Sequence, residues 1–383
     1  MSLAPSFDEL TSRFREFMDS CSQDAVTCHE FQFDRFALEL FSLQFNRNAA
    51  YRIFCEARNA TPSTVSHWAE IPAVPAAAFK DLDLTSLSDR EYTTVFHSSG
   101  TTGQKPSRHF HNAQSLALYE TSLLSGFFSA AFPGAQPSQA PGNTRWHLGI
   151  LTPPPFQAPH SSLVHMFDTL RRAFGEADAA FLGKIGVNRG WTSDSETVVA
   201  FLNKCSGGDS PVLFLGTAFS YVHLLDYLIA QGLQFTLPSG SRVLETGGYK
   251  GLSRFVPKTE LHELITERLG VQSSQIICEY GMSELSSQAY DRPPGFLLRK
   301  SATNLNQARF LFPPWAKAQI VSPETGGEVS DGETGLLKII DLANVYSVMA
   351  IQTEDLGIRR DEGFELLGRE SAAEPRGCSL MAT

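Results

Sequence analysis

A stretch rich in serine, threonine and glycine carries the strongest chemical signal in this sequence. Its members are Ser98, Ser99, Gly100, Thr101, Thr102 and Gly103, and Lys105 and Pro106 follow shortly after. Glycine permits unusual dihedrals and close approach of the backbone, so hydroxyl and N–H groups can line a concave anion site. Lys105 adds a movable positive charge. Together these groups are what a triphosphate requires.

This loop differs from the common P-loop, in which the sequence G-x-x-x-x-G-K-[ST] is needed. Here the two glycines are three positions apart and the lysine stands two positions beyond the second. The alternative interpretation is a hydroxyl-rich turn that caps the next helix.

A second group of chemically capable residues ends a predicted strand at Glu279–Glu284. Tyr280, Gly281, Ser283 and Glu284 combine an aromatic face, a flexible backbone position, a hydroxyl and a carboxylate. A carboxylate is a hard oxygen ligand of the kind that Mg²⁺ prefers. Taken alone, the hexapeptide would be interpreted by default as a strand end that exposes a glutamate.

Three weaker motifs accompany these two. Asp355 stands in the sequence TEDLG, and a carboxylate that accepts two hydroxyl hydrogen bonds suits a vicinal diol. Arg369 follows Gly368, and the glycine pair Gly247 and Gly248 comes shortly after the strand predicted at 242–244. A plain acidic turn is the alternative for the aspartate motif.

A cysteine near the end of the sequence could act as a nucleophile. Cys378 follows Arg376 and Gly377, so the backbone is free to move and a nearby cation favours the thiolate. A thiolate can attack an activated carbonyl. The alternative is an incidental tail residue. The other cysteines are scattered, which favours reduced thiols and a cytoplasmic protein.

The elements that must position these residues alternate between strands and helices from about residue 90. We expect strands at 92–96, 147–151, 212–215, 242–244 and 275–280, and helices beginning near 112 and spanning 219–230 and 258–269. Such alternation predicts an α/β fold with a largely parallel sheet. Helical spacing of phenylalanines predicts N-terminal helices before it.

The pattern changes after about residue 295 to short strands separated by turns, expected at 316–321, 335–341, 346–351 and 364–367. We therefore predict three parts: an α/β core over 1–295, a small β-rich subdomain over 296–370 that completes a nucleotide site, and a flexible tail over 371–383.

Composition excludes several classes of protein. Of 383 residues, 31 are lysine or arginine and 41 are aspartate or glutamate, which gives a formal net charge of −10. This acidic balance argues against nucleic acid as a partner. No apolar stretch is long enough for a transmembrane helix.

The order of these motifs resembles that of adenylate-forming enzymes, the superfamily of acyl-CoA synthetases and peptide-synthetase adenylation domains. The resemblance implies their layered α/β fold and the substrates ATP and Mg²⁺. It implies that the loop at 98–103, with Lys105, grips the β- and γ-phosphates. Tyr280 would lie against adenine beside Gly247, Gly248 and Gly281.

The same resemblance assigns the remaining polar residues. Ser283 would contact the α-phosphate, Glu284 would hold magnesium, Asp355 would bind the ribose hydroxyls, and Arg369 would contact ribose or phosphate. A departure from the pattern is that the usual mobile C-terminal domain with its late lysine is not expected here.

Within the superfamily the sequence is similar to the acyl-protein synthetases, LuxE type. The similarity rests on compact length and on Gly247–Lys250, Tyr280–Leu285, Ser287, Gln288 and Tyr290, Pro313–Trp315, Asp341–Asn344 and the terminal Arg-Gly-Cys-Ser. It implies that a long-chain fatty acid is activated as an acyl-adenylate, transferred to Cys378 as a thioester and passed to a fatty-acid reductase partner.

Two other functions remain open from the sequence. An acyl- or aryl-CoA ligase shares the first half-reaction, and Cys378 would then be dispensable. A non-catalytic nucleotide-binding module of the same fold is the other alternative, against which the presence of Lys105 and Glu284 argues. His160 is a further candidate that could face the substrate carboxylate. Phenylalanines 127, 128, 214 and 219 could line an acyl tunnel or belong to the core.

Overall fold

The computed structural model describes residues 6–23, 30–98, 105–133, 144–175, 178–186, 190–248, 253–292, 309–361 and 363–369. These residues form two compact units, each built from several stretches of the chain. Unit 1 comprises residues 1–96, 105–126 and 283–374, and unit 2 comprises residues 97–104, 127–282 and 375–383. The boundaries predicted at residues 295 and 370 stay predictions.

Unit 2 is built on a parallel sheet in the order β10-β9-β8-β4-β5. Its strands are β4 (His147–Ile150), β5 (Ala179–Phe181), β8 (Val212–Thr217), β9 (Arg242–Thr246) and β10 (Ile276–Tyr280), with a small hairpin of β6 (Gly183–Ile185) and β7 (Trp191–Ser193). Every residue of β8 is buried, as expected for a strand covered on both faces. Because the strands are parallel, their carboxyl ends meet at one edge.

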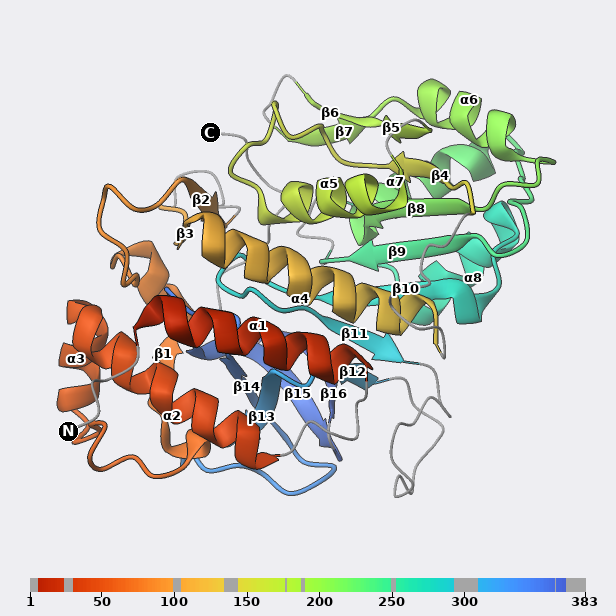
Figure 1. Cartoon of the computed structure of the whole chain (residues 1–383). Coiled ribbons are helices and arrows are strands. Elements are labelled where there is room, and N and C mark those ends of the chain that lie inside the picture. Colours follow the sequence, from red (N-terminus) through yellow and green to blue (C-terminus); the bar gives the residue numbers. More distant parts are fainter. Residues whose placement is uncertain are drawn as a thin grey trace. The chain divides into compact units, whose positions relative to one another are not determined.

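Helices cover both faces of this sheet (Figure 1). They are α5 (Ser162–Phe174), α6 (Ser195–Cys205), α7 (Ala218–Ala230) and α8 (Lys258–Leu269). Helices α6, α7 and α8 lie on one face of the sheet, where they share a core with β8 and β9. The strand order reverses after β5, and since crossovers between parallel strands are right-handed, this reversal puts α5 on the opposite face.

Helix ends follow ordinary capping rules. The side chain of Ser161 accepts from Val164 N at the start of α5, and Thr217 and Ser220 form a capping box on α7. Gly270 ends α8 at φ +68°, a conformation that glycine adopts without steric cost.

Unit 1 contains an antiparallel sheet in the order β13-β14-β15-β16-β12-β11, and β1 adds to β15 in parallel. The strands are β1 (Val74–Pro75), β11 (Ala289–Arg292), β12 (Arg309–Leu311), β13 (Ala316–Val321), β14 (Thr334–Asp341), β15 (Ala350–Arg360) and β16 (Gly363–Arg369). A separate ribbon pairs β2 (Thr94–His97) with β3 (Arg108–His111).

The N-terminal helices of unit 1 are α1 (Phe7–Gln23), α2 (Glu30–Arg47) and α3 (Ala49–Glu56), and α4 (Ala113–Ala131) follows β3. Short 3₁₀ turns lie at Trp68–Glu70, Ala76–Lys80 and, in unit 2, Ser273–Gln275. The predicted phenylalanine spacing is confirmed: Phe14 and Phe17 of α1 pack on Phe36 of α2 with ring centroids 5.7 and 5.1 Å apart.

The predicted mixed α/β architecture is confirmed, and the strand predicted at 346–351 is wrong over its first part. No strand runs over 346–349 in the described chain, because that segment is a buried turn and β15 begins only at Ala350. For the TEDLG motif, the alternative of a plain acidic turn is excluded, since the motif lies within β15. Among the described residues, no helix is both long and apolar enough to cross a membrane.

Candidate active site

Tyr280 and Gly247 stand at the carboxyl ends of neighbouring parallel strands in unit 2. Glu279 of β10 is paired in register with Thr246 of β9, so the residues that follow them leave the sheet side by side. Gly247 has φ +70°, and a β-carbon at Gly247 or Gly248 would meet no atom within 4 Å. The exposed glycine backbone borders open space at the edge where α/β sheets bind ligands.

A buried acidic cluster lies just behind this edge, and the sequence interpretation did not assign it. The Thr246 hydroxyl donates to the carboxyl of Glu279, which is buried. Burial raises the pKa of Glu279 to about 7, and the charge of Glu245 adds to the effect, while the Thr246 hydrogen bond opposes it. Glu245 in turn lies 3.4 Å from His262 Nε2 on α8. The signal in the sequence was a glutamate near the carboxyl end of each of two strands, Glu245 on β9 and Glu279 on β10.

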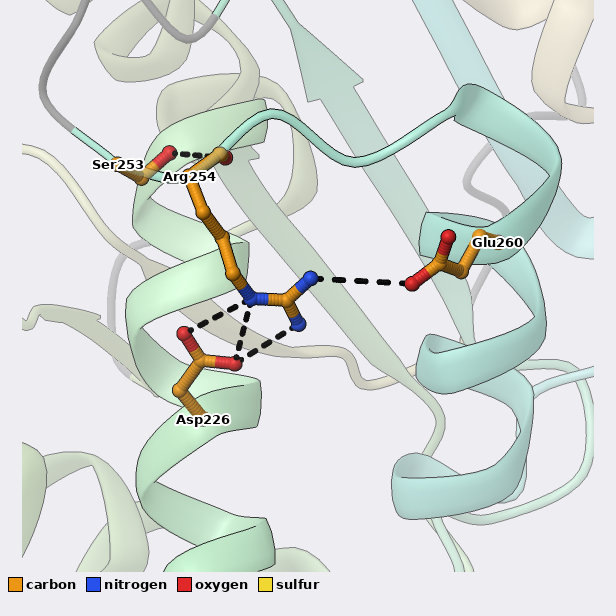
Figure 2. A network of polar contacts seen from close by, with 4 residues as sticks. All are labelled: Asp226, Ser253, Arg254 and Glu260. Atoms are coloured by element: carbon orange, nitrogen blue, oxygen red, sulfur yellow. Dashed lines mark hydrogen bonds and ion pairs between the residues drawn. The ribbon is translucent and has the colours of Figure 1, made fainter.

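A surface ion network holds Arg254, which stands just before α8 (Figure 2). The Arg254 guanidinium donates to both carboxylate oxygens of Asp226 on α7, with Nη2–Oδ1 at 2.9 Å. Its Nη1 lies 3.7 Å from Glu260 Oε1 on α8. Arg254 therefore ties the segment before α8 to α7.

The stacked imidazoles of His97 and His160 also belong to unit 2. Their ring centroids are 4.7 Å apart with an interplanar angle of 16°, and His97 N donates to His160 O at 2.8 Å. His160 is exposed just before the N-terminus of α5, and Ser98, which directly follows His97, is buried. The stack thus joins the start of the predicted phosphate loop to the start of α5.

Ser283 and Glu284 lie in unit 1, where both side chains are buried. His109 Nδ1 lies 2.8 Å from Ser283 O, and burial lowers the pKa of His109 to about 4. A neutral ring at physiological pH carries one N–H, and a carbonyl can only accept, so His109 donates to Ser283. This residue was not predicted from the sequence.

The donor set around Glu284 fits a metal that arrives with phosphates. Among the residues that the structure describes, no group of three or more His, Cys, Asp or Glu side chains could hold a metal ion. Mg²⁺ is usually bound by one or two carboxylates together with waters and substrate phosphates, not by a cage made wholly of protein. A single buried carboxylate next to a serine hydroxyl matches that pattern.

Lys105 is held only loosely in unit 1. Its Nζ lies 3.9 Å from Asp81 Oδ1, and the two side chains are 56% and 80% exposed. An exposed pair at this distance contributes little stability, about 0–1 kcal/mol. The lysine can therefore leave Asp81 for a stronger anion.

Asp355 and Arg369 occupy directly opposite positions in the β15–β16 ladder of unit 1. The backbone N–H of Asp355 donates to Thr353 Oγ1 at 3.1 Å, and that hydroxyl donates to Leu337 O at 2.9 Å. Two motifs separated in the sequence are thus brought to one point of a sheet.

Several predicted residues lie outside the described chain: Ser99, Gly100, Thr101, Thr102, Gly103 and Cys378. Their roles, and the expectation that Glu284 and the loop at 98–107 face one nucleotide, stay predictions. Cys55 and Cys205 are buried free cysteines, whereas Cys21 is disulfide-bonded, which differs from the expectation of reduced thiols throughout.

The phenylalanines considered for an acyl tunnel are all buried. Phe214 stacks on Phe201 in the core of unit 2, and Phe128 stacks on Phe174 with ring centroids 5.5 Å apart. The packing is that of a core.

Comparison with known sequences links the chain to a family of ligases. Residues 194–383 match the family model described as acyl-protein synthetase, LuxE. A long-chain-fatty-acid–luciferin-component ligase of Vibrio harveyi is 23% identical over 349 residues, which cover 89% of this chain and 84% of that protein. The protein of the same name from Aliivibrio fischeri is 22% identical and covers 91% and 86%.

Comparison with solved structures supports the fold. A 2-hydroxyisobutyryl-CoA ligase, solved in an open conformation with 2-HIB-AMP and CoA, aligns with a TM-score of 0.65 at 13% identity. The alignment covers 89% of this chain and 74% of that one. The same ligase in its postadenylation state also gives a TM-score of 0.65. The predicted adenylate-forming fold is confirmed.

Proposed function

We propose that this chain is a ligase of the acyl-protein synthetase type, which activates a long-chain fatty acid with ATP and then carries the acyl group on Cys378; its residues 194–383 match the family model described as acyl-protein synthetase, LuxE. The observation that supports nucleotide binding is the placement of Tyr280 beside Gly247 and Gly248 at adjacent strand ends. The matched residues, 194–383, include Gly247, Tyr280 and Cys378.

In the first half-reaction, a carboxylate oxygen of the fatty acid attacks the α-phosphorus of ATP, and the bond to pyrophosphate breaks. The loop at 98–103 and Lys105 bind the β- and γ-phosphates and stabilise the charge that develops on the leaving group. Tyr280 offers its ring to the adenine, and Asp355 accepts hydrogen bonds from the ribose hydroxyls. Catalysis of this kind consists mainly of positioning and electrostatic stabilisation.

Glu284 would hold Mg²⁺, with Ser283 beside it at the α-phosphate. When bound, the ion supplies charge neutralisation on the phosphate oxygens. The part played by the protein is to keep the Glu284 carboxylate oriented and dry, and both side chains are buried in unit 1.

In the second half-reaction, the Cys378 thiolate attacks the acyl carbonyl of the mixed anhydride, a carbon–sulfur bond forms and AMP leaves. The thioester then passes its acyl group to a reductase partner. We propose a cytoplasmic setting for this sequence, which the buried free cysteines Cys55 and Cys205 favour and the disulfide of Cys21 opposes.

The first experiment measures pyrophosphate–ATP exchange with a panel of fatty acids. Exchange that depends on the acid supports an adenylating enzyme, and its absence with every acid would refute the proposal in favour of a non-catalytic module.

The second experiment incubates the protein with ATP, Mg²⁺ and the active acid and locates acyl adducts by mass spectrometry. We expect an adduct on the Cys378 peptide that hydroxylamine removes, none in Cys378→Ser, and full labelling in the matched variant Ser379→Ala. Exchange should persist in Cys378→Ser. Rapid acyl transfer to coenzyme A without any protein adduct would instead favour an acyl-CoA ligase.

A further inference from the structure

The turn formed by residues 283–287, here called the carboxylate turn, is held from several elements of unit 1. His109 on β3 contacts Ser283 O at 2.8 Å. Asn344 Nδ2 donates to Glu284 O at 2.9 Å. Asp341, the last residue of β14, accepts the backbone N–H groups of both Ser286 and Ser287, at 2.9 and 2.8 Å. The backbone on either side of the Glu284 side chain is therefore fixed.

A chain of buried hydrogen bonds reaches the same turn from the far side. Trp315 Nε1 donates to Ser122 Oγ at 2.8 Å, and Ser122 Oγ donates to Ser287 Oγ at 3.0 Å. Ser287 Oγ then donates to Asp341 Oδ1 at 2.7 Å. The indole N–H can only donate and an ionised carboxylate can only accept, so each hydroxyl has a single allowed orientation. We call this chain the Trp315–Asp341 relay.

The relay is costly unless every member is satisfied. Asp341 is fully buried, and its partners are the hydroxyl of Ser287 and the N–H groups of Ser286, Ser287 and Ala343, the last at 3.0 Å. Burying a carboxylate opposes folding, and apolar residues of similar volume would serve stability at least as well. What a satisfied polar network adds is one defined geometry.

This network unites motifs that the proposed mechanism leaves without a role. Ser287, Trp315 and the pair of Asp341 and Asn344 come from three separate parts of the sequence. Asp341 and Asn344 contact the carboxylate turn directly, and Trp315 reaches it through Ser122. Contacts that fix the backbone on both sides of Glu284 also restrict the direction in which its side chain leaves the turn.

We propose that Asp341 is a positioning residue that acts through the Trp315–Asp341 relay to hold Glu284 in the orientation for Mg²⁺·nucleotide, an inference that rests on the proposed function. Groups that orient a metal ligand without touching the metal typically change metal affinity about 10–100-fold when they are removed. The relay supplies that support to Glu284.

The test measures binding without turnover, as the thermal stabilisation given by α,β-methylene-ATP across a range of Mg²⁺ concentrations. The variants are Ser287→Ala, which breaks the relay at Asp341, and Trp315→Phe, which keeps the ring and removes only the far donor. The matched control is Ser241→Ala in unit 2, since Ser241 is also buried, donates to Pro238 O and accepts from Val212 N.

We expect the Mg²⁺ midpoint to rise about 10-fold in Ser287→Ala and by a smaller factor in Trp315→Phe, with Ser241→Ala at the wild-type value. Affinity for the nucleotide without Mg²⁺ should be unchanged in all three. If Ser287→Ala does not fold, the midpoint of Trp315→Phe decides.

Wild-type Mg²⁺ midpoints in both relay variants would overturn the inference while leaving the proposed function intact. By contrast, a wild-type protein that shows neither Mg²⁺-dependent stabilisation nor acid-dependent pyrophosphate exchange would refute the proposed function, and the inference with it.

Discussion

Asp355 and Arg369 face each other across the β15–β16 ladder, immediately beside an irregularity in that ladder. Leu356 pairs with Gly368 and Gly357 pairs with Leu366, so β16 carries one extra residue between them. Gly368 adopts φ +120° at this point. Bulges of this kind bend a strand and re-aim the side chains that follow, and they are frequent beside active sites. The bulge thus lies next to the position of β16 that pairs with Asp355.

The first prediction concerns the ribose contact of Asp355. Asp355→Asn removes one charged acceptor and should raise the KM for ATP about 10-fold or more, because hydrogen bonds to charged groups contribute about 1.5–3 kcal/mol each. The wild type should also discriminate against 2′-deoxy-ATP in pyrophosphate exchange, and the variant should lose most of that discrimination. Equal discrimination in both would contradict the role, and Asp361→Asn, at the turn between the same strands, provides the control.

Gly368→Ala tests the bulge itself. A β-carbon would meet no atom within 4 Å, so any cost comes from the backbone conformation at φ +120° and not from a clash. Strain of this kind is worth about 1–3 kcal/mol, and thermal denaturation should show a loss of that order. Gly327→Ala, a glycine without positive φ in an open turn of the same unit, should leave the melting temperature nearly unchanged. A stable Gly368→Ala with unchanged kinetics would contradict the argument.

Substitutions of Lys105 and of Asp81 should differ strongly in their effect on activity, although the two residues form one ion pair. Lys105→Ala should lower the rate of acyl-adenylate formation by about 100-fold, as expected when a stabilising group is lost from a developing charge. Asp81→Asn should stay within twofold of the wild type and keep its melting temperature, because the exposed pair is weak. Single-turnover measurement of AMP formation separates the two. A similar loss in both variants would mean that the ion pair is structural.

Much of the fold could be predicted because its signals are local. Lys258–Leu269 was predicted as a helix and Ala316–Val321 as a strand with the observed ends, since apolar spacing and turn residues mark both. The error at 346–349 has a different origin: Asn344 Nδ2 donates to Val348 O, and Asp341 N donates to Met349 O, so buried contacts hold a turn where β-branched residues favour a strand.

The motifs of the candidate site could be named from the sequence, but the contacts that support them could not. Gly247 and Tyr280 were expected at a nucleotide site from the family resemblance; the structure places them at adjacent strand ends, and their contact with a nucleotide stays a prediction. His109 and Ser122 escaped notice because each acts through a contact with a residue more than 150 positions away, at Ser283 and Ser287 respectively. No periodicity or spacing encodes such a pairing.

Acid sensitivity should arise in part from His109. Burial lowers its pKa to about 4, whereas the unfolded chain titrates near 6.5. Below pH 6.5 the unfolded state gains a proton that the folded state does not, so the free energy of unfolding falls until about pH 4. His109→Asn keeps an N–H donor for Ser283 O but cannot titrate, and denaturation between pH 4 and 7 should show a shallower slope. His223→Asn, at an exposed position on α7, should keep the wild-type slope; identical slopes in all three proteins would refute the assignment.

Ionisation of Glu279 should change the free energy of unfolding with pH in the direction opposite to that expected from His109. Burial raises the pKa of Glu279 in the folded protein to about 7, above the ordinary value of 4.5. The stabilisation that comes from keeping this carboxyl protonated in the folded protein is therefore fully present below pH 4.5. As pH rises from 4.5 to 7, the unfolded chain releases the proton and the folded chain keeps it, so the free energy of unfolding declines, by as much as ~3 kcal/mol. Glu279→Gln retains a carbonyl oxygen for the Thr246 hydroxyl and carries no charge. The variant should therefore match the wild type in stability at pH 4.5 and exceed it at pH 8, as chemical denaturation at both values would reveal. Glu267→Gln, which alters a half-exposed side chain on α8, should show no such divergence. Parallel curves for Glu279→Gln and the wild type would mean that Glu279 is already ionised in the folded protein at pH 5.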